Sequence, residues 1–249
     1  MKSRLRAWAD GLGDVVFPRS CLHCQAVVEP PAGDGAGLRH LCRRCTALVE
    51  VVRPPHCLTC GHPYYGAVEG ERMCPHCEGL MPEFGEGRTA VLFKGPARTL
   101  VIEFKYHGGL YVLEDLAAIF RRAPELLDHV RGAVLVPVPL HPRKARERGY
   151  NQAELLATSL AGAAGGGTAV VPLLRRQVDS ESQTALDRQA RLGSLKNAFA
   201  LAPGASLTPG QHYILVDDVF TTGSTLNRCA HVLRRAGVLN LDVVTFGHG

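Results

Sequence analysis

The hydrophobic pattern of the chain changes near residue 80, and only the part after it shows long periodic segments. Short apolar runs bounded by turn residues predict buried strands, here at residues 89–93, 133–138, 168–173, 213–216 and 241–246. Helical periodicity predicts helices over residues 97–105, 110–122, 151–161 and 224–236. This alternation is typical of an α/β fold with a parallel sheet and helices on both of its faces.

The segment before residue 80 has a different composition. It holds four CxxC pairs and many Pro and Gly residues, without a long periodic segment. We therefore expect a small N-terminal module at residues 1–80 and an α/β domain at residues 81–249. Within the second part, residues 177–197 form a long polar stretch without clear strand character. Connections of that length in compact domains often act as functional lids.

Composition narrows the classes of protein that fit. Of the 249 residues, 46% are hydrophobic and 20% charged, which is typical of a folded globular protein. The net charge of +5 suits a protein that binds anions, but a dedicated nucleic-acid-binding domain is usually more basic. The chain has no run of eighteen apolar residues, so no membrane span is predicted. Because Asp10 and Asp14 interrupt the apolar stretch that a signal peptide needs, we expect a cytoplasmic protein.

Eight of the nine cysteines form the four CxxC pairs, and the ninth, Cys229, stands alone. The pairs are Cys21/Cys24, Cys42/Cys45, Cys57/Cys60 and Cys74/Cys77. Each pair forms a tight turn that directs two sulfurs to one point, and two turns supply the four thiolates of a tetrahedral zinc ion. In a reducing compartment such clustering favours metal over disulfides. We therefore predict two closed, structural zinc sites.

The spacing leaves the pairing of the four turns open. Sequential pairing joins the first pair to the second and the third to the fourth, whereas a cross-brace joins the first to the third and the second to the fourth. We favour sequential pairing because each site then closes a shorter loop at lower entropic cost. Disulfides, unliganded thiols and an iron–sulfur cluster are the competing interpretations.

The most informative segment runs from residue 213 to residue 225, where an apolar strand leads into two acids, a hydroxyl-rich loop and a helix. In parallel sheets, ligands bind just beyond the carboxyl ends of the strands. Asp217 and Asp218 are placed there to accept hydrogen bonds from sugar hydroxyls. The helix N-terminus favours a phosphate, and the loop adds Thr221, Thr222, Gly223, Ser224 and Thr225. We predict a ribose 5-phosphate site; the competing interpretation is an ordinary strand–helix turn with a Thr or Ser N-cap.

This segment, Leu215-Val-Asp-Asp-Val-Phe-Thr-Thr-Gly-Ser-Thr225, resembles the phosphoribosyl pyrophosphate signature of type I phosphoribosyltransferases. With the four CxxC pairs before it, the chain resembles the ComF family of bacterial competence-related proteins, also called amidophosphoribosyltransferase-like. Further blocks at residues 104–106, 136–152 and 183–199 are similar to the family pattern. The resemblance implies a type I phosphoribosyltransferase-like sheet preceded by a double zinc ribbon.

The resemblance also implies roles for residues outside the signature. The loop after the strand at residues 134–138 would bind pyrophosphate through its cations Arg143, Lys144, Arg146 and Arg148. Arg188 and Arg191 belong to a stretch similar to the mobile loop that closes over substrate in this fold, and Lys105 would contact a phosphate. The implied cofactors are two structural zinc ions and a magnesium ion bound mainly to oxygens of phosphoribosyl pyrophosphate.

Two functions follow from the resemblance. The first is transfer of the phosphoribosyl group to an unknown acceptor, with Asp217 and Asp218 orienting the ribose while pyrophosphate leaves the anomeric carbon. The second is a non-catalytic, competence-associated role in which the same pocket binds phosphoribosyl pyrophosphate or single-stranded DNA during DNA uptake. Its partners would include DNA or competence proteins. No obvious residue selects an acceptor, so both hypotheses stay open.

Overall fold

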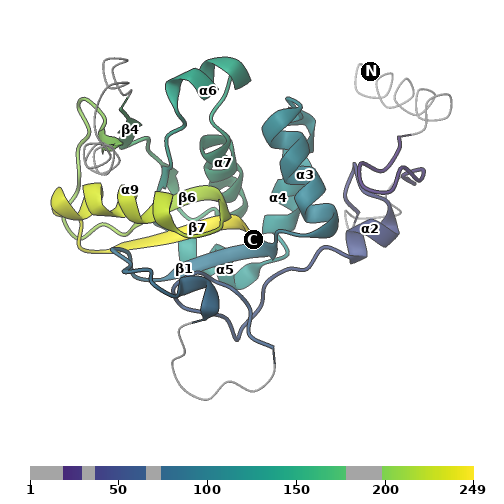
Figure 1. The fold of residues 1–249 in the computed structure, drawn as a ribbon, viewed down its shortest axis with the longest axis horizontal. Coiled ribbons are helices and arrows are strands. Elements are labelled where there is room, and N and C mark those ends of the chain that lie inside the picture. Colours follow the sequence, from purple (N-terminus) through teal and green to yellow (C-terminus); the bar gives the residue numbers. More distant parts are fainter. Residues whose placement is uncertain (1–18, 30–36, 66–73, 178–197) are drawn as a thin grey trace, which may run out of the picture.

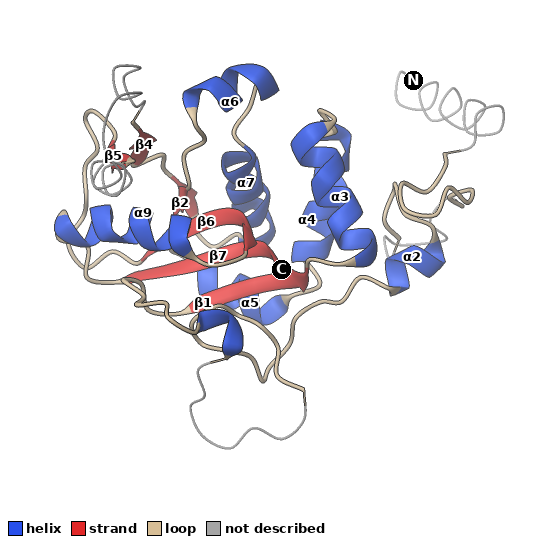
Figure 2. Cartoon of the chain, viewed as in Figure 1, coloured by secondary structure: helices blue, strands red, loops and turns tan. Residues whose placement is uncertain are grey.

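A computed structural model describes residues 19–29, 37–65, 74–177 and 198–249 of the chain. Its centre is a five-stranded parallel sheet with the strand order β1-β7-β6-β2-β3 (Figures 1 and 2). The strands are β1 (Gly87–Leu92), β2 (Val134–Pro137), β3 (Ala169–Val170), β6 (Tyr213–Phe220) and β7 (Leu241–His248). The predicted parallel sheet is confirmed.

Helices cover both faces of this sheet. One face carries α3 (Gly95–Tyr106), α4 (Leu113–Phe120), α5 (Pro124–Val130) and α7 (Gln152–Ala164), and the other carries α9 (Ser224–Arg235). Adjacent residues of a strand point to opposite faces, so Ile214 and Val216 pack into the first core and Leu215 into the second. The predicted α/β class, with helices on both faces, is confirmed.

The remaining described elements are short. They are α2 (Arg43–Ala47), η1 (Pro75–Cys77), η2 (Leu110–Val112), α6 (Pro142–Arg148) and the antiparallel pair β4 (Leu174–Arg176) and β5 (Phe199–Leu201). The strand expected at residues 168–173 is reduced to β3, and β4 follows it in a separate hairpin. β6 runs past the predicted end at residue 216, because its pairing with β7 continues to Phe220 opposite His248.

The second half of the N-terminal region packs directly on the sheet. Cys57 and Cys77 belong to the same apolar core as Leu215 and the inner side of α9. The Gly87 N–H donates to the Leu58 carbonyl at 2.6 Å, and the Thr89 hydroxyl donates to the Cys60 carbonyl at 3.0 Å. A Cβ at Gly87 would lie 2.1 Å from the Thr59 carbonyl oxygen, so only glycine permits this close approach.

The first half of the N-terminal region attaches to the helices of the opposite face. Asp115 of α4 is almost fully buried and accepts hydrogen bonds from the backbone N–H groups of Arg39, at 2.6 Å, and His40, at 2.9 Å. Cys21 and Cys45 share the apolar core that α4 lines. A buried carboxylate needs such partners, so this contact fixes the segment to the helix.

Among the described residues, no helix has both the length and the apolar character required to cross a membrane.

Candidate functional site

The eight paired cysteines form two clusters of four sulfurs, namely Cys21, Cys24, Cys42 and Cys45, and Cys57, Cys60, Cys74 and Cys77. Within each cluster all four Sγ atoms lie within 4.8 Å of one another. The Sγ atoms are 3.4 Å apart between Cys60 and Cys74 and 3.8 Å apart between Cys57 and Cys77. Sulfurs about 2.3 Å from a tetrahedral zinc ion are about 3.8 Å apart. Sequential pairing is confirmed, and the donor sets fit two structural zinc sites.

All nine cysteines lie within the described residues and are free thiols. The disulfide interpretation is therefore wrong. Cys229 is buried in α9 among apolar side chains and lies outside both clusters.

The acidic pair lies where β6 approaches its carboxyl end. Asp217 Oδ1 accepts a hydrogen bond from the backbone N–H of Asp218 at 2.8 Å. Asp218 Oδ1 forms an ion pair with Lys105 Nζ at 2.8 Å, and both side chains are largely buried. Burial, followed by the neighbouring Asp218 carboxylate, raises the pKa of Asp217 to about 7. The structure thus joins Lys105 of α3 to Asp218 of β6; a contact of Lys105 with a phosphate stays a prediction.

The loop after β6 is open to solvent. Thr221, Thr222, Ser224 and Thr225 are exposed, and the Thr222 and Ser224 hydroxyl oxygens lie 2.9 Å apart. The N-cap of α9 is Gly223, which offers no side-chain cap, and the Ser224 N–H makes only a 3.4 Å bond to the Thr222 hydroxyl. The first N–H groups of α9 are therefore available to an anion.

Gly223 cannot be replaced without strain. Its φ of +68° lies in the left-handed region, and an added Cβ would lie 2.6 Å from the Phe220 ring. Glycine lets the backbone turn sharply from β6 into α9. The chain thereby turns from the acids to the hydroxyl groups within a few residues.

The basic residues after β2 lie on a short helix, α6, where the sequence analysis expected a loop. Because β2 pairs with β6, α6 follows the same edge of the sheet that holds the acidic pair. In Figure 1, α6 and α3 rise on the same side of the sheet. The Arg148 guanidinium lies over the ring of Tyr106, 5.0 Å from its centre, next to Lys105 in sequence.

The other three cations of α6 point to solvent. Arg143, Lys144 and Arg146 are exposed, and Arg143 pairs with Glu147 at 2.9 Å. Among the described residues, no hydrogen bond or ion pair joins these three to the acids or to the hydroxyl loop. Arg188 and Arg191 lie outside the described residues; β4 and β5 pair on either side of that segment.

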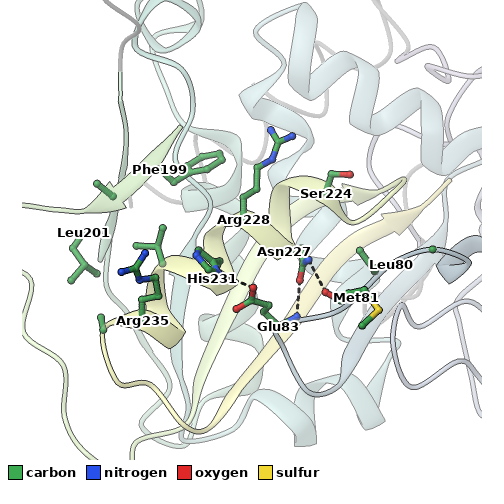
Figure 3. A pocket seen from close by; sticks show the side chains of 14 residues that line it. Leu80, Met81, Glu83, Phe199, Leu201, Ser224, Asn227, Arg228, His231 and Arg235 are labelled. Carbon is green, nitrogen blue, oxygen red and sulfur yellow. Dashed lines mark hydrogen bonds and ion pairs between the residues drawn. The ribbon is translucent and has the colours of Figure 1, made fainter. Parts of the chain in front are cut away.

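A groove of about 1140 Å³ runs along α9 from the hydroxyl loop (Figure 3). Its walls include Leu80, Met81, Phe199, Leu201, Arg228 and Arg235. Asn227 connects α9 to the opposite wall, since its Oδ1 accepts from the Glu83 N–H at 2.6 Å and its Nδ2 donates to the Met81 carbonyl at 2.8 Å. His231 pairs with Glu83 at 2.7 Å.

The residues of this groove were not predicted from the sequence. The polar side chains at 224, 227, 228, 231 and 235 recur at helical spacing. They lie opposite the buried face of α9, which carries Leu226, Cys229, Ala230 and Leu233. This row of polar side chains was the sequence signal that could have indicated the groove. It is not specific, because an exposed polar face is common on any surface helix.

Comparison with known proteins gives relatives over nearly the full chain. Residues 12–78 match the family model of the double zinc ribbon domain. The chain is 29% identical over 237 residues to Competence protein F of Haemophilus influenzae, covering 91% of this chain and 96% of the relative. It is 29% identical over 247 residues to the DNA utilization protein YhgH of Escherichia coli K12, covering 92% of this chain and 96% of the relative. It is 26% identical over 208 residues to Competence protein ComFC of Bacillus subtilis, covering 79% of each chain.

Solved structures overlap with the chain only in part. The allosteric regulatory enzyme of purine biosynthesis superposes with a TM-score of 0.35 and 17% identity, covering 54% of this chain and 26% of that one. A hypoxanthine phosphoribosyltransferase of Staphylococcus aureus superposes with a TM-score of 0.34 and 17% identity, covering 53% of this chain and 62% of that one.

Proposed function

The chain belongs to the ComF family of competence-related proteins, and from this premise we propose that the carboxyl edge of its sheet binds phosphoribosyl pyrophosphate. One observation carries the proposal. The acidic pair of β6 leads, through an open hydroxyl-lined loop, into the N-terminus of α9, which has no side-chain cap. Carboxylates accept hydrogen bonds from sugar hydroxyls, and a helix N-terminus with hydroxyl donors suits a phosphate.

Each group has a role in the proposed complex. Asp217 and Asp218 hold the ribose hydroxyls, and the loop from Thr221 to Thr225 holds the 5-phosphate. Lys105 faces Asp218 in the free protein and is within reach of a phosphate there. Of the basic residues after β2, Arg148 is the best placed to contact the diphosphate because it lies against Tyr106.

We propose further that the bound sugar is transferred to an acceptor. The bond between the anomeric carbon and the diphosphate oxygen breaks, and pyrophosphate leaves with the electron pair. A nucleophile, usually nitrogen, forms the new bond and releases its proton to water. Magnesium, bound mainly to the diphosphate, supplies charge neutralisation for the leaving group. The protein contributes orientation through the acids and charge stabilisation through its cations.

Release of pyrophosphate tests the transfer. The full chain is incubated with phosphoribosyl pyrophosphate, magnesium and a panel of nucleobases and small amines. We expect pyrophosphate to appear faster with at least one acceptor than without any. If the ligand binds but no acceptor accelerates release, the transferase proposal is wrong and the binding proposal stands. If the ligand does not bind, both are wrong.

The groove along α9 favours a second candidate function, binding of single-stranded DNA. Arg228 and Arg235 supply positive charge beside the apolar side chains of Phe199 and Met81, which suits a polyanion whose bases stack. The names of the relatives, competence and DNA utilization proteins, are compatible with this role.

Salt dependence tests the DNA candidate. Binding of a labelled single-stranded oligonucleotide is measured by fluorescence anisotropy over a range of salt concentrations. Each phosphate contact contributes about 0.7 to the slope of log affinity against log salt, so Arg228→Ala with Arg235→Ala should reduce the slope by about 1.4. Arg131→Ala, a change at the C-cap of α5 on the opposite face, serves as the control and should leave the slope unchanged. Equal slopes for all three proteins would exclude the groove as the DNA site.

A further inference from the structure

Two histidines and an aspartate meet at the amino-terminal edge of the sheet, opposite the acidic pair. His212 precedes β6, Asp242 is the second residue of β7, and His129 lies in the last turn of α5. Their ligand atoms lie within 4.8 Å of one another. Asp242 Oδ2 is 2.9 Å from His212 Nε2 and 3.4 Å from His129 Nε2. Three segments far apart in sequence thus direct metal-binding atoms to one point.

The carboxylate is held so that one oxygen faces both rings. Asp242 Oδ1 accepts the backbone N–H of Glu86 at 2.7 Å. A Cβ at Gly85 would lie 2.7 Å from this oxygen, so the glycine leaves room for the carboxylate. Oδ2 is then directed at the two imidazoles. A backbone hydrogen bond that orients a ligating carboxylate is a common feature of metal sites.

The Nε2 atom of His129 is buried and makes no hydrogen bond among the described residues. It lies 3.4 Å from Asp242 Oδ2. Its other nitrogen, Nδ1, lies 3.9 Å from Glu86 Oε2. A histidine whose Nδ1 faces a carboxylate presents Nε2 for coordination. A buried nitrogen without a hydrogen bond is costly unless something binds it.

The charges around the cluster suit a cation. Burial lowers the pKa of His129. Burial opposes ionisation of Asp242, but the hydrogen bonds from His212 and the Glu86 N–H lower its pKa. Arg88, whose positive charge acts on His129, is paired with Glu86 at 2.6 Å.

We propose that His129, His212 and Asp242 form a third metal site, separate from the two cysteine clusters, for a divalent transition ion of the zinc class. Two imidazole nitrogens and a carboxylate oxygen are ligands that zinc, cobalt and nickel accept. Ligands about 2.0–2.1 Å from a tetrahedral ion are about 3.3 Å apart, close to the observed 2.9 and 3.4 Å. The bound ion would cross-link α5 to β7 and to the residue before β6.

Cobalt provides the test. The full chain, with zinc in both cysteine clusters, is titrated with Co²⁺ while visible absorption and metal content are recorded. We expect one Co²⁺ per chain with the weak bands of nitrogen and oxygen ligation and no sulfur-to-cobalt charge-transfer band. No bound Co²⁺ in the unmodified chain overturns the proposal, as does a charge-transfer band, because the ion would then occupy a cysteine cluster.

Matched variants locate the ion. His129→Ala and His212→Ala, tested separately, should each weaken Co²⁺ binding by at least about 10-fold. His107→Ala is the control, since His107 also pairs with a carboxylate, Glu103, at 2.7 Å. Its Co²⁺ affinity should equal that of the unmodified chain. A variant counts only if it retains two zinc ions per chain. Unchanged affinity in both His129→Ala and His212→Ala would place the ion elsewhere.

Discussion

Replacing Asp217 and Asp218 together by asparagine is expected to weaken the binding of phosphoribosyl pyrophosphate by about 100-fold or more. The two carboxylates are the proposed acceptors for the ribose hydroxyls, and each charged hydrogen bond contributes about 1.5–3 kcal/mol. Loss of both removes at least about 3 kcal/mol, which corresponds to roughly 100-fold in the dissociation constant. Isothermal titration calorimetry with magnesium present measures the effect.

The control for this variant is Asp128→Asn, a change at an exposed acid of α5 that pairs with Arg131. It should bind the ligand as the unmodified chain does. Both proteins should retain two zinc ions, because neither change touches a cysteine cluster. Equal affinity of the double variant and the unmodified chain would show that the acids do not hold the ribose.

The double variant should not lose affinity through unfolding. Because burial raises the pKa of Asp217 to about 7, the folded chain retains a proton that the unfolded chain has already lost. The resulting stabilisation is complete below about pH 4 and is lost as the pH rises towards 7. Asp217→Asn has no carboxyl group at this position and so does not lose stability in this way. The difference between its free energy of unfolding and that of the unmodified chain should therefore increase by up to about 1.4 kcal/mol per pH unit between about pH 5 and pH 7.

Removing the second zinc is expected to unfold the sheet along with the cysteine cluster. A structural zinc contributes about 10–16 kcal/mol of apparent binding free energy, whereas whole domains are stable by about 5–15 kcal/mol. In the turn that holds Cys57 and Cys60, the carbonyls of Leu58 and Cys60 accept hydrogen bonds from the Gly87 N–H and the Thr89 hydroxyl of β1. We therefore expect Cys60→Ser to lower the melting temperature by more than about 10 °C, as measured by circular dichroism together with zinc content.

Cys229→Ala is the matched control, because Cys229 is also buried on the α9 face but belongs to neither cluster. It should retain two zinc ions and a melting temperature near that of the unmodified chain. A Cys60→Ser protein that loses one zinc while its sheet melts at the original temperature would contradict the expected coupling. The proposed division into residues 1–80 and 81–249 would then also describe two units of independent stability.

Much of the site could be predicted because its parts are contiguous in the chain. The acids, the hydroxyl loop and the start of α9 lie between residues 217 and 225, so backbone connectivity alone brings them together. The same holds for each CxxC turn, whose two sulfurs are three residues apart. Alternation of apolar strands and helices was sufficient to predict a parallel sheet with two covered faces.

Some elements left no signal in the hydrophobic pattern. α6 buries none of its residues, so it lacks the apolar face from which a helix is recognised. Its ends are set by Pro142 in the first turn and by Gly149, which has a φ of +79°. The true end of β6 depends on the neighbouring strand, because β7 continues the hydrogen-bonded register to Phe220.

The sequence by itself determined the local chemistry of this protein, namely four CxxC turns and a strand that leads through two acids into a hydroxyl-rich loop. Only the tertiary structure decided which cysteine turns lie together, that Lys105 faces Asp218, and that His129 meets His212 and Asp242. The physical reason is that local contacts follow from the geometry of a few consecutive residues. Contacts between distant segments depend on how the whole chain packs, and many pairings satisfy the same pattern of polar and apolar positions.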